Sequence, residues 1–350
     1  MSVKFDTLAA LLDHGYDALI DVRSPAEFAE DHIPGAINLP VLSNEERAAV
    51  GTIYKQVAPF EARKVGAALV SRNAADHIAG PLAGFDGSWR PAIYCWRGGQ
   101  RSGSFASILQ QIGWRADLID GGYQSYRRLV HAAMYDAALP HGLVLLDGNT
   151  GTAKTDILAR LAAMGVQTLD LEGLAGHRGS LLGGLPEGQP SQKRFEALVA
   201  CAFQRLDPTK ITIVEAESSK IGKLIIPPAV WAKMVPAPRI QIDAPLDARA
   251  AWLIEAYCDI IADPIRLRAR LEILRRHQGH VIVDHWLSLL NAGDNLGLAG
   301  ALMSEHYDPA YAKSRASHDH AVVVVLKANT LDRAGRDDLA VRIRQAVANL

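Results

Sequence analysis

The sequence predicts an α/β protein with two parallel-sheet domains, the second of which carries a C-terminal helical subdomain. The chain of 350 residues is long enough for two independent hydrophobic cores. Short apolar runs alternate with helix-like stretches over residues 19–123, a pattern typical of a parallel sheet covered by helices. Another apolar run, at residues 142–147, leads through a glycine-rich turn into a further helix-like stretch, which predicts the second sheet.

The first domain is predicted to contain a buried strand at residues 19–23. Ser24 can cap the helix that follows, because Pro25 suits its first position and Glu27 its first turn. Residues 33–40 supply a turn and a second strand, and further strands are expected at 92–94 and 116–120. Open parallel sheets bind ligands at the carboxyl ends of their strands, so the segment after residue 94 is a candidate site.

Cys95 opens the loop CWRGGQRS, directly after a strand and ahead of a helix-like stretch at 103–112. The backbone N–H groups of Gly98 and Gly99, the positive end of the helix, and the side chains of Arg97 and Arg101 would favour a thiolate or a chalcogen-loaded form. This combination is typical of a sulfur-transfer cysteine. A buried structural cysteine is the alternative, because lone cysteines after strands are common in cores.

The composition indicates a reducing compartment. The three cysteines lie far apart in the sequence and match no zinc-site spacing. The N-terminus lacks the pattern of a signal peptide, and there is no run of about 18 uncharged apolar residues, so we expect a cytoplasmic protein without a membrane partner. The formal net charge of −1 gives no overall attraction to nucleic acid, so an RNA partner would need a local basic face.

The second domain carries a candidate phosphate-binding loop, GNTGTAKT, between a strand and a helix. Its predicted phosphate-binding residues are Gly148, Thr150, Gly151, Lys154 and Thr155. Lys154 would reach the terminal phosphates, and the Thr155 hydroxyl is a candidate ligand of Mg²⁺. Ala153 stands where the pattern has glycine, which costs about 1–2 kcal/mol if φ must be positive there and nothing if the residue already belongs to the helix. An ordinary strand-to-helix turn is the alternative.

A strand at residues 211–214 ends in acidic residues, which is where phosphate-binding sites usually hold a metal ion or its water. Glu215 and Glu217 would point the same way on a strand, and with Thr155 they form the predicted metal site. A solvated strand end is the alternative. His177 and Arg178 lie in a glycine-rich loop between these elements and are candidates for contact with an anionic substrate, unless they are an exposed pair without function.

From residue 246 onward the pattern is mainly helical, and residues 266–277 form a basic amphipathic segment. Its predicted RNA-binding residues are Arg266, Arg270, Arg275 and Arg276. A salt-bridged solvent face is the alternative. The apolar run at 321–326 is expected to return as a strand to the second sheet. We therefore expect domains at 1–135, 140–245 and 246–320, with 321–350 supplying the return strand and C-terminal helix of the second domain.

The first half resembles the rhodanese family at both of that family's recognition stretches, residues 21–38 and 95–123, although Asp31 stands where the family usually has glycine. From about residue 20 to residue 311, the chain resembles the bacterial tRNA 2-selenouridine synthase family. The segments 169–180, 189–192, 215–219 and 305–309 carry this resemblance together with the two loops. Ala153 departs from the glycine of the phosphate-loop pattern, and Ala216 departs from an aspartate that the family tends to have.

The resemblance implies an enzyme that replaces sulfur by selenium in 2-thiouridine at the wobble position of certain tRNAs. Selenophosphate would supply the selenium, and geranyl diphosphate would supply an S-geranylated intermediate. Cys95 would carry a persulfide or perselenide, and the loop with Lys154 would bind the diphosphate, with Mg²⁺ as a candidate ligand and no redox cofactor. The expected partners are tRNAs with Lys-, Glu- or Gln-type anticodon loops and a supplier of selenophosphate.

Two other functions fit the same residues. A rhodanese-type sulfurtransferase fused to a P-loop kinase or nucleotidase would use both loops but would bind ATP rather than geranyl diphosphate. A non-catalytic RNA-binding regulator is the other alternative, and Ala153 and Ala216 are the only hints of it. The nucleosides of tRNA from a strain that lacks the gene would distinguish these functions.

Overall fold

The computed structural model describes residues 1–180, 182–316 and 321–350. The chain forms two compact units: Met1–Ala138 with Pro190–Arg205, and Leu139–Gln189 with Leu206–Leu350. The expected fold class, two α/β domains with a helical region toward the C-terminus, is confirmed. One segment differs from the expected division, because residues 190–205 belong to the first unit and not to the second domain.

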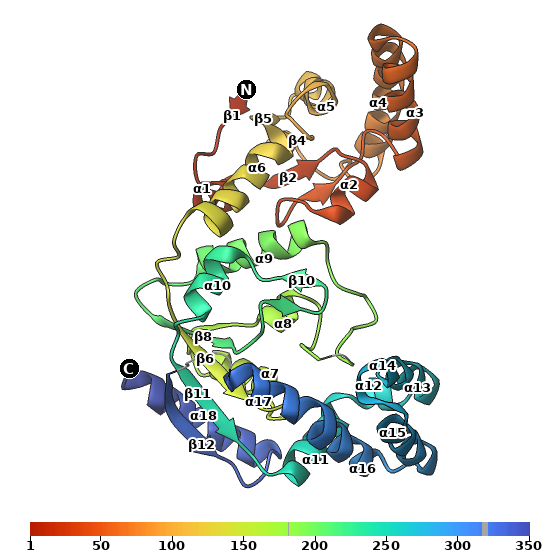
Figure 1. Ribbon diagram of the computed structural model, residues 1–350. Coiled ribbons are helices and arrows are strands. Elements are labelled where there is room, and N and C mark those ends of the chain that lie inside the picture. The colour runs from red at the N-terminus through yellow and green to blue at the C-terminus, as the bar shows by residue number, and fades with distance from the viewer. Residues whose placement is uncertain (181, 317–320) are drawn as a thin grey trace. The chain divides into compact units, whose positions relative to one another are not determined.

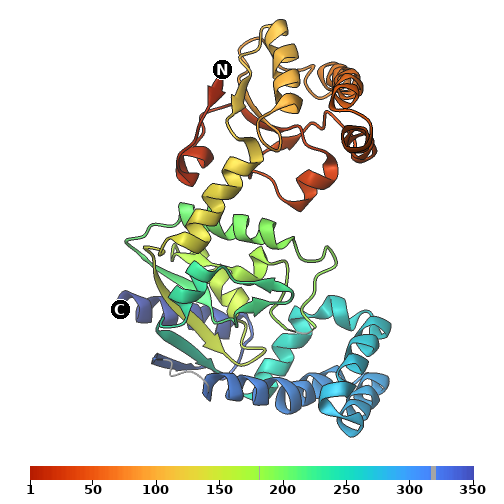
Figure 2. The same cartoon turned by 45° about the horizontal axis from the view of Figure 1, so that its top comes forward.

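The first unit is built on a parallel five-stranded sheet in the order β1-β5-β4-β2-β3 (Figure 1). Its strands are β1 (Ser2–Val3), β2 (Ala18–Asp21), β3 (Ile37–Asn38), β4 (Pro91–Tyr94) and β5 (Asp117–Ile119). Its helices are α1 (Leu8–Leu12), α2 (Pro25–Glu30), α3 (Asn44–Gln56), α4 (Pro59–Ala79), α5 (Gln100–Ile112), α6 (Gly122–His131), α9 (Gln192–Arg205) and the π-helical turn η1 (Ala132–Asp136). Helices α3 and α4 form a hairpin and lie side by side in both ribbon views (Figure 2).

The central strands β2 and β4 position the first loop of interest. Both are almost entirely buried, as a sheet covered on two faces requires, and Ile20 pairs with Ile93 in their parallel register. Helix α5 packs Phe105 and Leu109 into the same core. It begins at Gln100, earlier than the stretch expected at 103–112, so the positive end of the helix comes close to Cys95.

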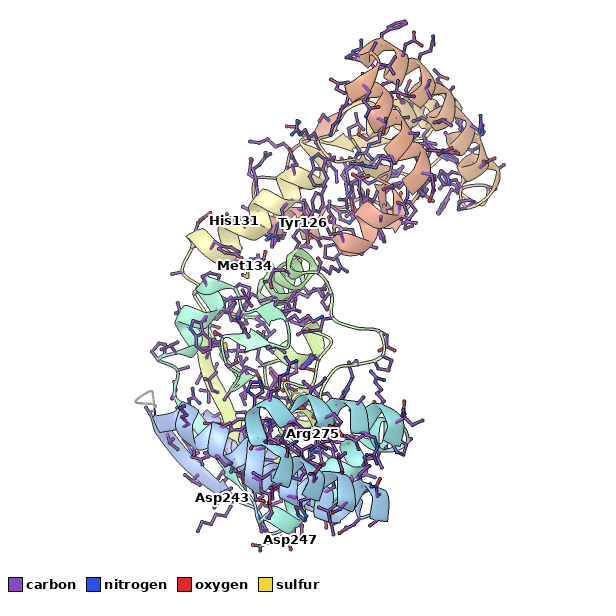
Figure 3. The ribbon with its side chains drawn as sticks, turned by 45° about the vertical axis from the view of Figure 1, so that its right-hand side comes forward. Tyr126, His131, Met134, Asp243, Asp247 and Arg275 are labelled. Atoms are coloured by element: carbon purple, nitrogen blue, oxygen red, sulfur yellow. The ribbon has the colours of Figure 1, made fainter. Side chains whose placement is uncertain are left out.

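Contacts of α9 explain why residues 190–205 belong to the first unit. Helix α9 packs against α1, α6 and η1, and the last two carry the buried side chains of Tyr126 and Met134 (Figure 3). Glu196 on α9 is ion-paired with Arg127 and accepts a hydrogen bond from Tyr135 (2.6 Å). A buried carboxylate stabilises a fold only when it is paired in this way, so α9 is fixed to α6 and η1.

The second unit contains a parallel five-stranded sheet in the order β12-β11-β6-β8-β7. Its strands are β6 (Gly142–Gly148), β7 (Thr168–Leu169), β8 (Ile211–Glu215), β11 (Arg239–Asp243) and β12 (Val322–Lys327), beside the antiparallel hairpin of β9 (Lys220–Ile221) and β10 (Leu224–Ile225). The helices that accompany the sheet are α7 (Lys154–Ala163), α8 (Leu171–Leu174), α10 (Pro228–Met234) and α18 (Arg333–Ala348). Strand β12 pairs with β11, which confirms the expected return strand.

The helical region follows β11 and has a hydrophobic core of its own, with the fully buried Trp286 among its members. Its elements are α11 (Leu246–Ala256), α12 (Cys258–Ile261), α13 (Pro264–Ile273), α14 (Arg275–Gln278), α15 (His280–Ala292), α16 (Asn295–Leu302), η2 (Met303–Tyr307) and α17 (Asp308–Ala316). Residues 317–320 of the expected subdomain lie outside the described residues. Across the part of the chain that the structure describes, no helix combines the length and apolar character needed to cross a bilayer.

Candidate functional site

The thiol of Cys95 lies at the carboxyl end of β4 and at the N-terminus of α5. Its Sγ accepts hydrogen bonds from the Gly99 N–H (3.3 Å) and from the Ser102 hydroxyl (3.2 Å). The residue is only 3% exposed, yet the sulfur faces polar donors and a helix terminus rather than hydrocarbon alone. The structure therefore agrees with both sequence-based alternatives in part: the cysteine is buried, and its sulfur accepts hydrogen bonds from the loop.

These contacts lower the pKa of the Cys95 thiol. Burial by itself raises that pKa, but the hydroxyl and backbone N–H of Ser102 oppose the effect of burial. The charge of Arg101 and the N–H of Gly99 lower the pKa further, and together these groups outweigh burial. Cys201 in the same unit is also buried, and there burial raises the thiol pKa. Only the first of these two cysteines has the electrostatic surroundings of a reactive thiolate.

Two glycines allow the loop to close against α6. Gly98 has φ +67°, and a Cβ there would lie 2.9 Å from the Ile119 carbonyl oxygen. Gly122 has φ +55°, and a Cβ there would collide with the Cys95 carbonyl. The Tyr123 N–H donates to that same carbonyl at 2.8 Å, so the first turn of α6 holds the loop in place. Gly99 makes no such close approach and instead precedes α5 as its N-cap.

The two arginines of the loop differ in their surroundings. Arg97 is exposed beside the loop. Arg101 donates to both carboxylate oxygens of Glu27, at 2.8 and 3.3 Å, and Arg47 pairs with the same carboxylate at 3.0 Å. Burial raises the pKa of Glu27, but these guanidinium groups bring it down to about 2. Arg101 and Arg47 therefore share the single negative charge of Glu27, whereas Arg97 is exposed to solvent at the loop, where it can meet an incoming anion.

Asp21 and Arg23 form a fully buried ion pair at 2.6 Å. Arg23 also donates to the Asp31 carbonyl (2.7 Å) and lies over the Tyr123 ring at 4.0 Å. These contacts join β2, the end of α2 and the first turn of α6. The pair is thus a structural support beneath the loop of Cys95.

The predicted phosphate loop lies between β6 and α7. Lys154 is the first residue of α7, and its Nζ donates to the Gly148 carbonyl at 3.0 Å. Ala153 has φ +59°, and among the described residues it is the only non-glycine with a positive φ. The position therefore has the left-handed conformation, and the alanine carries the cost of about 1–2 kcal/mol expected for a Cβ there. Gly151, with φ +83°, approaches the Arg249 carbonyl so closely that a Cβ would lie 3.0 Å from its oxygen.

A cavity of about 380 Å³ opens over this loop. Residues 150–155 line it, and so do His177 and Arg178, so the structure brings the loop and the two predicted substrate-contact residues together. Arg178 is held by an ion pair with Asp259 (3.1 Å), and burial lowers the pKa of His177. Gly148 does not line the cavity, but its carbonyl accepts the hydrogen bond from Lys154 Nζ.

The acidic residues divide between two environments. Glu215 accepts from the Leu171 N–H (3.1 Å), and burial, with Asp170 beside it, raises the pKa of Glu215 well above its ordinary value. Glu217 lies beyond the end of β8, where burial and a hydrogen bond with Glu172 raise its pKa in the same way. Thr155 donates to Glu172 at 3.0 Å. The structure thus brings Thr155 and Glu217 together through Glu172 and leaves Glu215 in a supporting position at the start of α8.

Glu172 is a residue that the sequence reasoning missed. Asp170 caps α8 through the Gly173 N–H (2.6 Å), and this cap turns Glu172 toward the phosphate loop. An acidic pair spaced by one residue in a glycine-rich loop was the available signal. Thr155, Glu172 and Glu217 offer hard oxygen atoms, the donor type of Mg²⁺, which often binds through one or two carboxylates plus substrate phosphates. Over the described ranges, no group of three or more His, Cys, Asp or Glu residues has the arrangement of a metal site.

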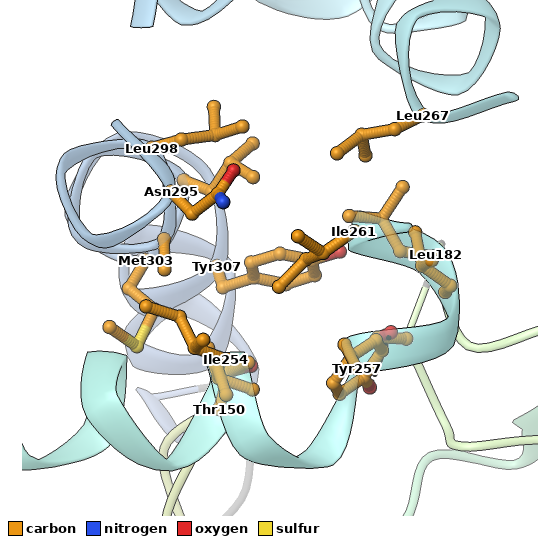
Figure 4. Close-up of a pocket in the computed structure, with 15 residues that line it drawn as sticks. Thr150, Leu182, Ile254, Tyr257, Ile261, Leu267, Asn295, Leu298, Met303 and Tyr307 are labelled. Atoms are coloured by element: carbon orange, nitrogen blue, oxygen red, sulfur yellow. Dashed lines mark hydrogen bonds between the residues drawn. The ribbon is translucent and has the colours of Figure 1, made fainter. Parts of the chain in front are cut away.

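An apolar cavity adjoins the phosphate loop (Figure 4). Ile254, Ile261, Leu267, Leu298 and Met303 from the helical region surround it. It shares four lining residues with the cavity over the phosphate loop: Thr150, Ser180, Leu253 and Tyr257. Its volume of about 70 Å³ is room for roughly five water molecules in a narrow space.

The predicted RNA-binding arginines differ in their surroundings. Arg270 donates to the carbonyls of Leu182 and Gly184 and so supports the loop beside the cavity. Arg275, on α14 (Figure 3), pairs with Glu272 and with Asp284 (2.7 Å). Arg266 and Arg276 are exposed, on α13 and α14 respectively. The salt-bridged alternative thus describes Arg275, and Arg270 has a structural role.

Comparison with known proteins gives the following similarities. The sequence model of the tRNA 2-selenouridine synthase AAA domain matches residues 141–279, and that of the rhodanese-like domain matches residues 4–129. The tRNA 2-selenouridine synthase of Chromohalobacter salexigens is 34% identical over 321 residues, which cover 84% of this chain and 86% of the relative. That of Alcanivorax borkumensis is 32% identical over 325 residues, covering 84% and 88%. A rhodanese-like domain protein from Staphylococcus aureus, of known structure, is 23% identical with a TM-score of 0.23, over 36% of this chain and 89% of that one.

Proposed function

The chain belongs to the tRNA 2-selenouridine synthase family, and from this premise we propose that it is a tRNA-modifying enzyme that replaces sulfur by selenium in wobble-position 2-thiouridine. Geranyl diphosphate alkylates the sulfur, and selenium from selenophosphate then displaces the alkylated sulfur. The tRNAs are of the Lys, Glu and Gln anticodon types, and the reaction takes place in the cytoplasm with a partner that supplies selenophosphate.

One observation carries the choice of geranyl diphosphate over ATP. The cavity over the phosphate loop adjoins the apolar cavity of the helical region, and the two share the lining residues Thr150 and Tyr257. A ligand that fills both spaces has a phosphorylated head and a hydrocarbon tail. A nucleoside would bring a polar sugar and base into a space walled by isoleucine, leucine and methionine, and their unpaired polar groups would be costly to bury.

The first half-reaction uses the residues of the phosphate loop. The sulfur of 2-thiouridine attacks C1 of the geranyl group, the C1–O bond breaks, and diphosphate leaves with the electron pair, while the base loses its N3 proton. Lys154 and the loop N–H groups stabilise the negative charge of the leaving diphosphate. Mg²⁺, held by Thr155, Glu172 and Glu217, would supply further charge neutralisation. Arg178 lines the same cavity and contributes a second positive charge.

The second half-reaction uses the loop of Cys95. The selenium of selenophosphate adds to C2 of the S-geranylated base, and geranyl thiol leaves with the electrons of the C–S bond and takes up a proton. Water then cleaves the P–Se bond, so that phosphate leaves and selenium stays on C2. An alkylated sulfur departs more readily than a thiocarbonyl sulfur, which is the chemical reason for the first step. The Cys95 thiol, whose pKa is lowered by Ser102, Arg101 and Gly99 against the effect of burial, holds the selenium donor at this loop during the exchange, and its own oxidation state does not change.

The test uses the purified full-length protein with a 2-thiouridine-containing tRNA. Cys95→Ser should abolish selenation and leave geranylation measurable, whereas Lys154→Met should reduce geranylation. Mass spectrometry of the digested nucleosides separates 2-thiouridine, its S-geranyl form and 2-selenouridine. Loss of both activities in Cys95→Ser would contradict this division of labour. Binding of ATP in preference to geranyl diphosphate would favour the kinase or nucleotidase alternative.

A further inference from the structure

A third cavity, of about 370 Å³, lies next to the cavity over the phosphate loop in the second unit. It is formed at the carboxyl ends of β6 and β8 and is covered by α10 and α17. Open α/β sheets bind ligands at this edge. Of its lining residues, the steps described above use only Glu217.

The two cavities share a wall. Gly179 and Tyr311 line both of them, and Glu217, which lines the third cavity, is hydrogen-bonded to Glu172 in the second. Tyr311 lies close enough to Lys154 for the lysine Nζ to approach its ring at 5.8 Å. A molecule in the third cavity would therefore lie next to the ligand of the phosphate loop, and placing two substrates side by side favours a transfer between them.

The lining of the third cavity contains an aromatic side chain and several polar side chains. Trp231 on α10 is half-buried and lines the cavity together with Met234. Asp147 and Arg239, which are paired at 3.0 Å, supply a carboxylate and a guanidinium, and Ser219 supplies an exposed hydroxyl. Nucleobases that leave a helical stack are typically recognised in this way, by an aromatic side chain on the ring face and by mixed donors and acceptors on the edge.

Positive charges flank the lining residues in the chain. Lys220 follows Ser219 directly and is exposed, and Lys223 is exposed in the β9–β10 hairpin. Lys233 lies between Trp231 and Met234 on α10 and is partly exposed. Although the whole chain has a formal net charge of −1, this segment offers the phosphate backbone of an RNA a local basic rim.

We propose that the third cavity binds the unstacked 2-thiopyrimidine base of the tRNA, with Trp231 stacking on its ring and its sulfur directed at the shared wall of Gly179 and Tyr311. This assignment rests on the function proposed above. It makes Trp231 a positioning residue for the RNA, not for the prenyl donor. The exposed Lys220 holds the adjoining phosphate.

The test measures binding and turnover of an anticodon stem-loop RNA that carries 2-thiouridine. Trp231→Ala should weaken the binding of this RNA by roughly ten- to a hundredfold and lower kcat/KM for it, because stacking on one base is lost. Trp231→Phe should restore most of the affinity, because it keeps an aromatic face. Geranyl diphosphate should bind both variants within about twofold of the parent, which also reports that the second unit is folded.

A second variant avoids the half-buried tryptophan. Ser219→Phe adds a ring at the exposed rim and should block the cavity, whereas Ser71→Phe at an exposed position of α4 is the matched control and should bind RNA normally. Lys220→Ala should weaken RNA binding and reduce the slope of log K against log salt by about one.

Each result has one meaning. If RNA binding is unchanged in both Trp231→Ala and Ser219→Phe, the assignment of the cavity is wrong, whatever the activity of the parent. If Trp231→Ala weakens the binding of ATP or geranyl diphosphate instead of the binding of RNA, the cavity belongs to the phosphorylated ligand, and the assignment is again overturned. If the parent protein forms no geranylated product but its RNA binding depends on Trp231, the proposed function fails while the base pocket stands.

Discussion

Asp31 provides a sharp test of the electrostatics beneath the loop of Cys95. Its carboxyl is fully buried, accepts a hydrogen bond from the Tyr123 hydroxyl at 2.9 Å, and lies 3.8 Å from the Arg194 guanidinium. Burial raises the pKa of Asp31 to about 6, against 3.8 for the ordinary group, although Tyr123 and Arg194 partly oppose the effect. A carboxylate that is ionised at neutral pH therefore destabilises the first unit.

The size and the sign of the effect follow from proton linkage. A difference of about two pH units between the folded and unfolded pKa corresponds to about 3 kcal/mol. Below the unfolded pKa of 3.8 both states are protonated and the cost vanishes. As the pH rises toward 6 the unfolded chain loses its proton first, so this group makes the folded state less stable, and above 6 the full cost is present.

Asp31→Asn keeps a side chain of the same shape without the charge. We expect it to stabilise the first unit by up to about 3 kcal/mol at about pH 7.5 and by well under 1 kcal/mol at about pH 4. Asp13→Asn, at an exposed position of α1's C-cap, is the matched control and should change little at either pH. The assay is amide hydrogen exchange of the segment 18–40 against urea, because exchange reports on the first unit alone. A variant that is less stable than the parent at about pH 7.5, or equally affected at both pH values, would refute the reasoning.

Three further predictions concern the loops and the apolar cavity. Ser102→Ala removes a hydroxyl that donates to Cys95 Sγ, so the thiol pKa should rise and alkylation of Cys95 at about pH 7 should slow several-fold. Peptide mass spectrometry measures the alkylation, and a pH profile that is the same as that of the parent would contradict this prediction. Ala299→Phe should fill the apolar cavity and weaken the binding of geranyl diphosphate by roughly thirtyfold, because excluding two or three methylene groups costs about 2 kcal/mol. Inorganic diphosphate should bind as before. An equal loss of binding for both ligands, or an equal effect of Ala292→Phe at an exposed position of α15, would argue against a prenyl site. Ala153→Gly should leave the free energy of unfolding within about 1 kcal/mol of the parent, because the relief of the positive φ is offset by the greater chain entropy of glycine. Ala153→Val should lower the free energy of unfolding by more than about 2 kcal/mol. Equal effects of the two variants in urea unfolding would mean that the positive φ of this residue is not maintained in solution.

The local motifs were predictable because their physics is short-range. The run from β4 through Cys95 into α5 and the run from β6 through Lys154 into α7 are each set by neighbouring residues, and both have the predicted strand-loop-helix order. The return of β12 to the second sheet was also predictable, because an uninterrupted β-branched run late in the chain has to be placed in a sheet. The conformation of Ala153 was left open by the sequence and has the left-handed φ.

Contacts between distant segments were the part that sequence reasoning could not supply. No local pattern indicated that Arg101, which is expected to serve an anionic donor, is hydrogen-bonded to Glu27, which lies 74 positions earlier. Residues 190–205 follow a loop of the second unit in sequence but pack with the first, since Glu196 is paired with Arg127 there. Nor did the sequence indicate that Arg270, a predicted RNA-binding residue, donates a hydrogen bond to the Leu182 carbonyl, 88 positions earlier.

By itself the sequence determined that two parallel-sheet units exist, where each presents a loop with the chemistry of a thiolate or of a phosphate cradle, and to which family the chain belongs. Hydrogen bonds and φ values within a few residues are sufficient for that. Only the tertiary structure decided that Glu172 joins Thr155 and Glu217, that an apolar cavity adjoins the phosphate loop, and that Tyr311 lines two neighbouring cavities. These features depend on side chains far apart in the chain, and their proximity is fixed by the packing of α8 against β8, of α11 against α16 and of α17 against η2, which no local pattern encodes.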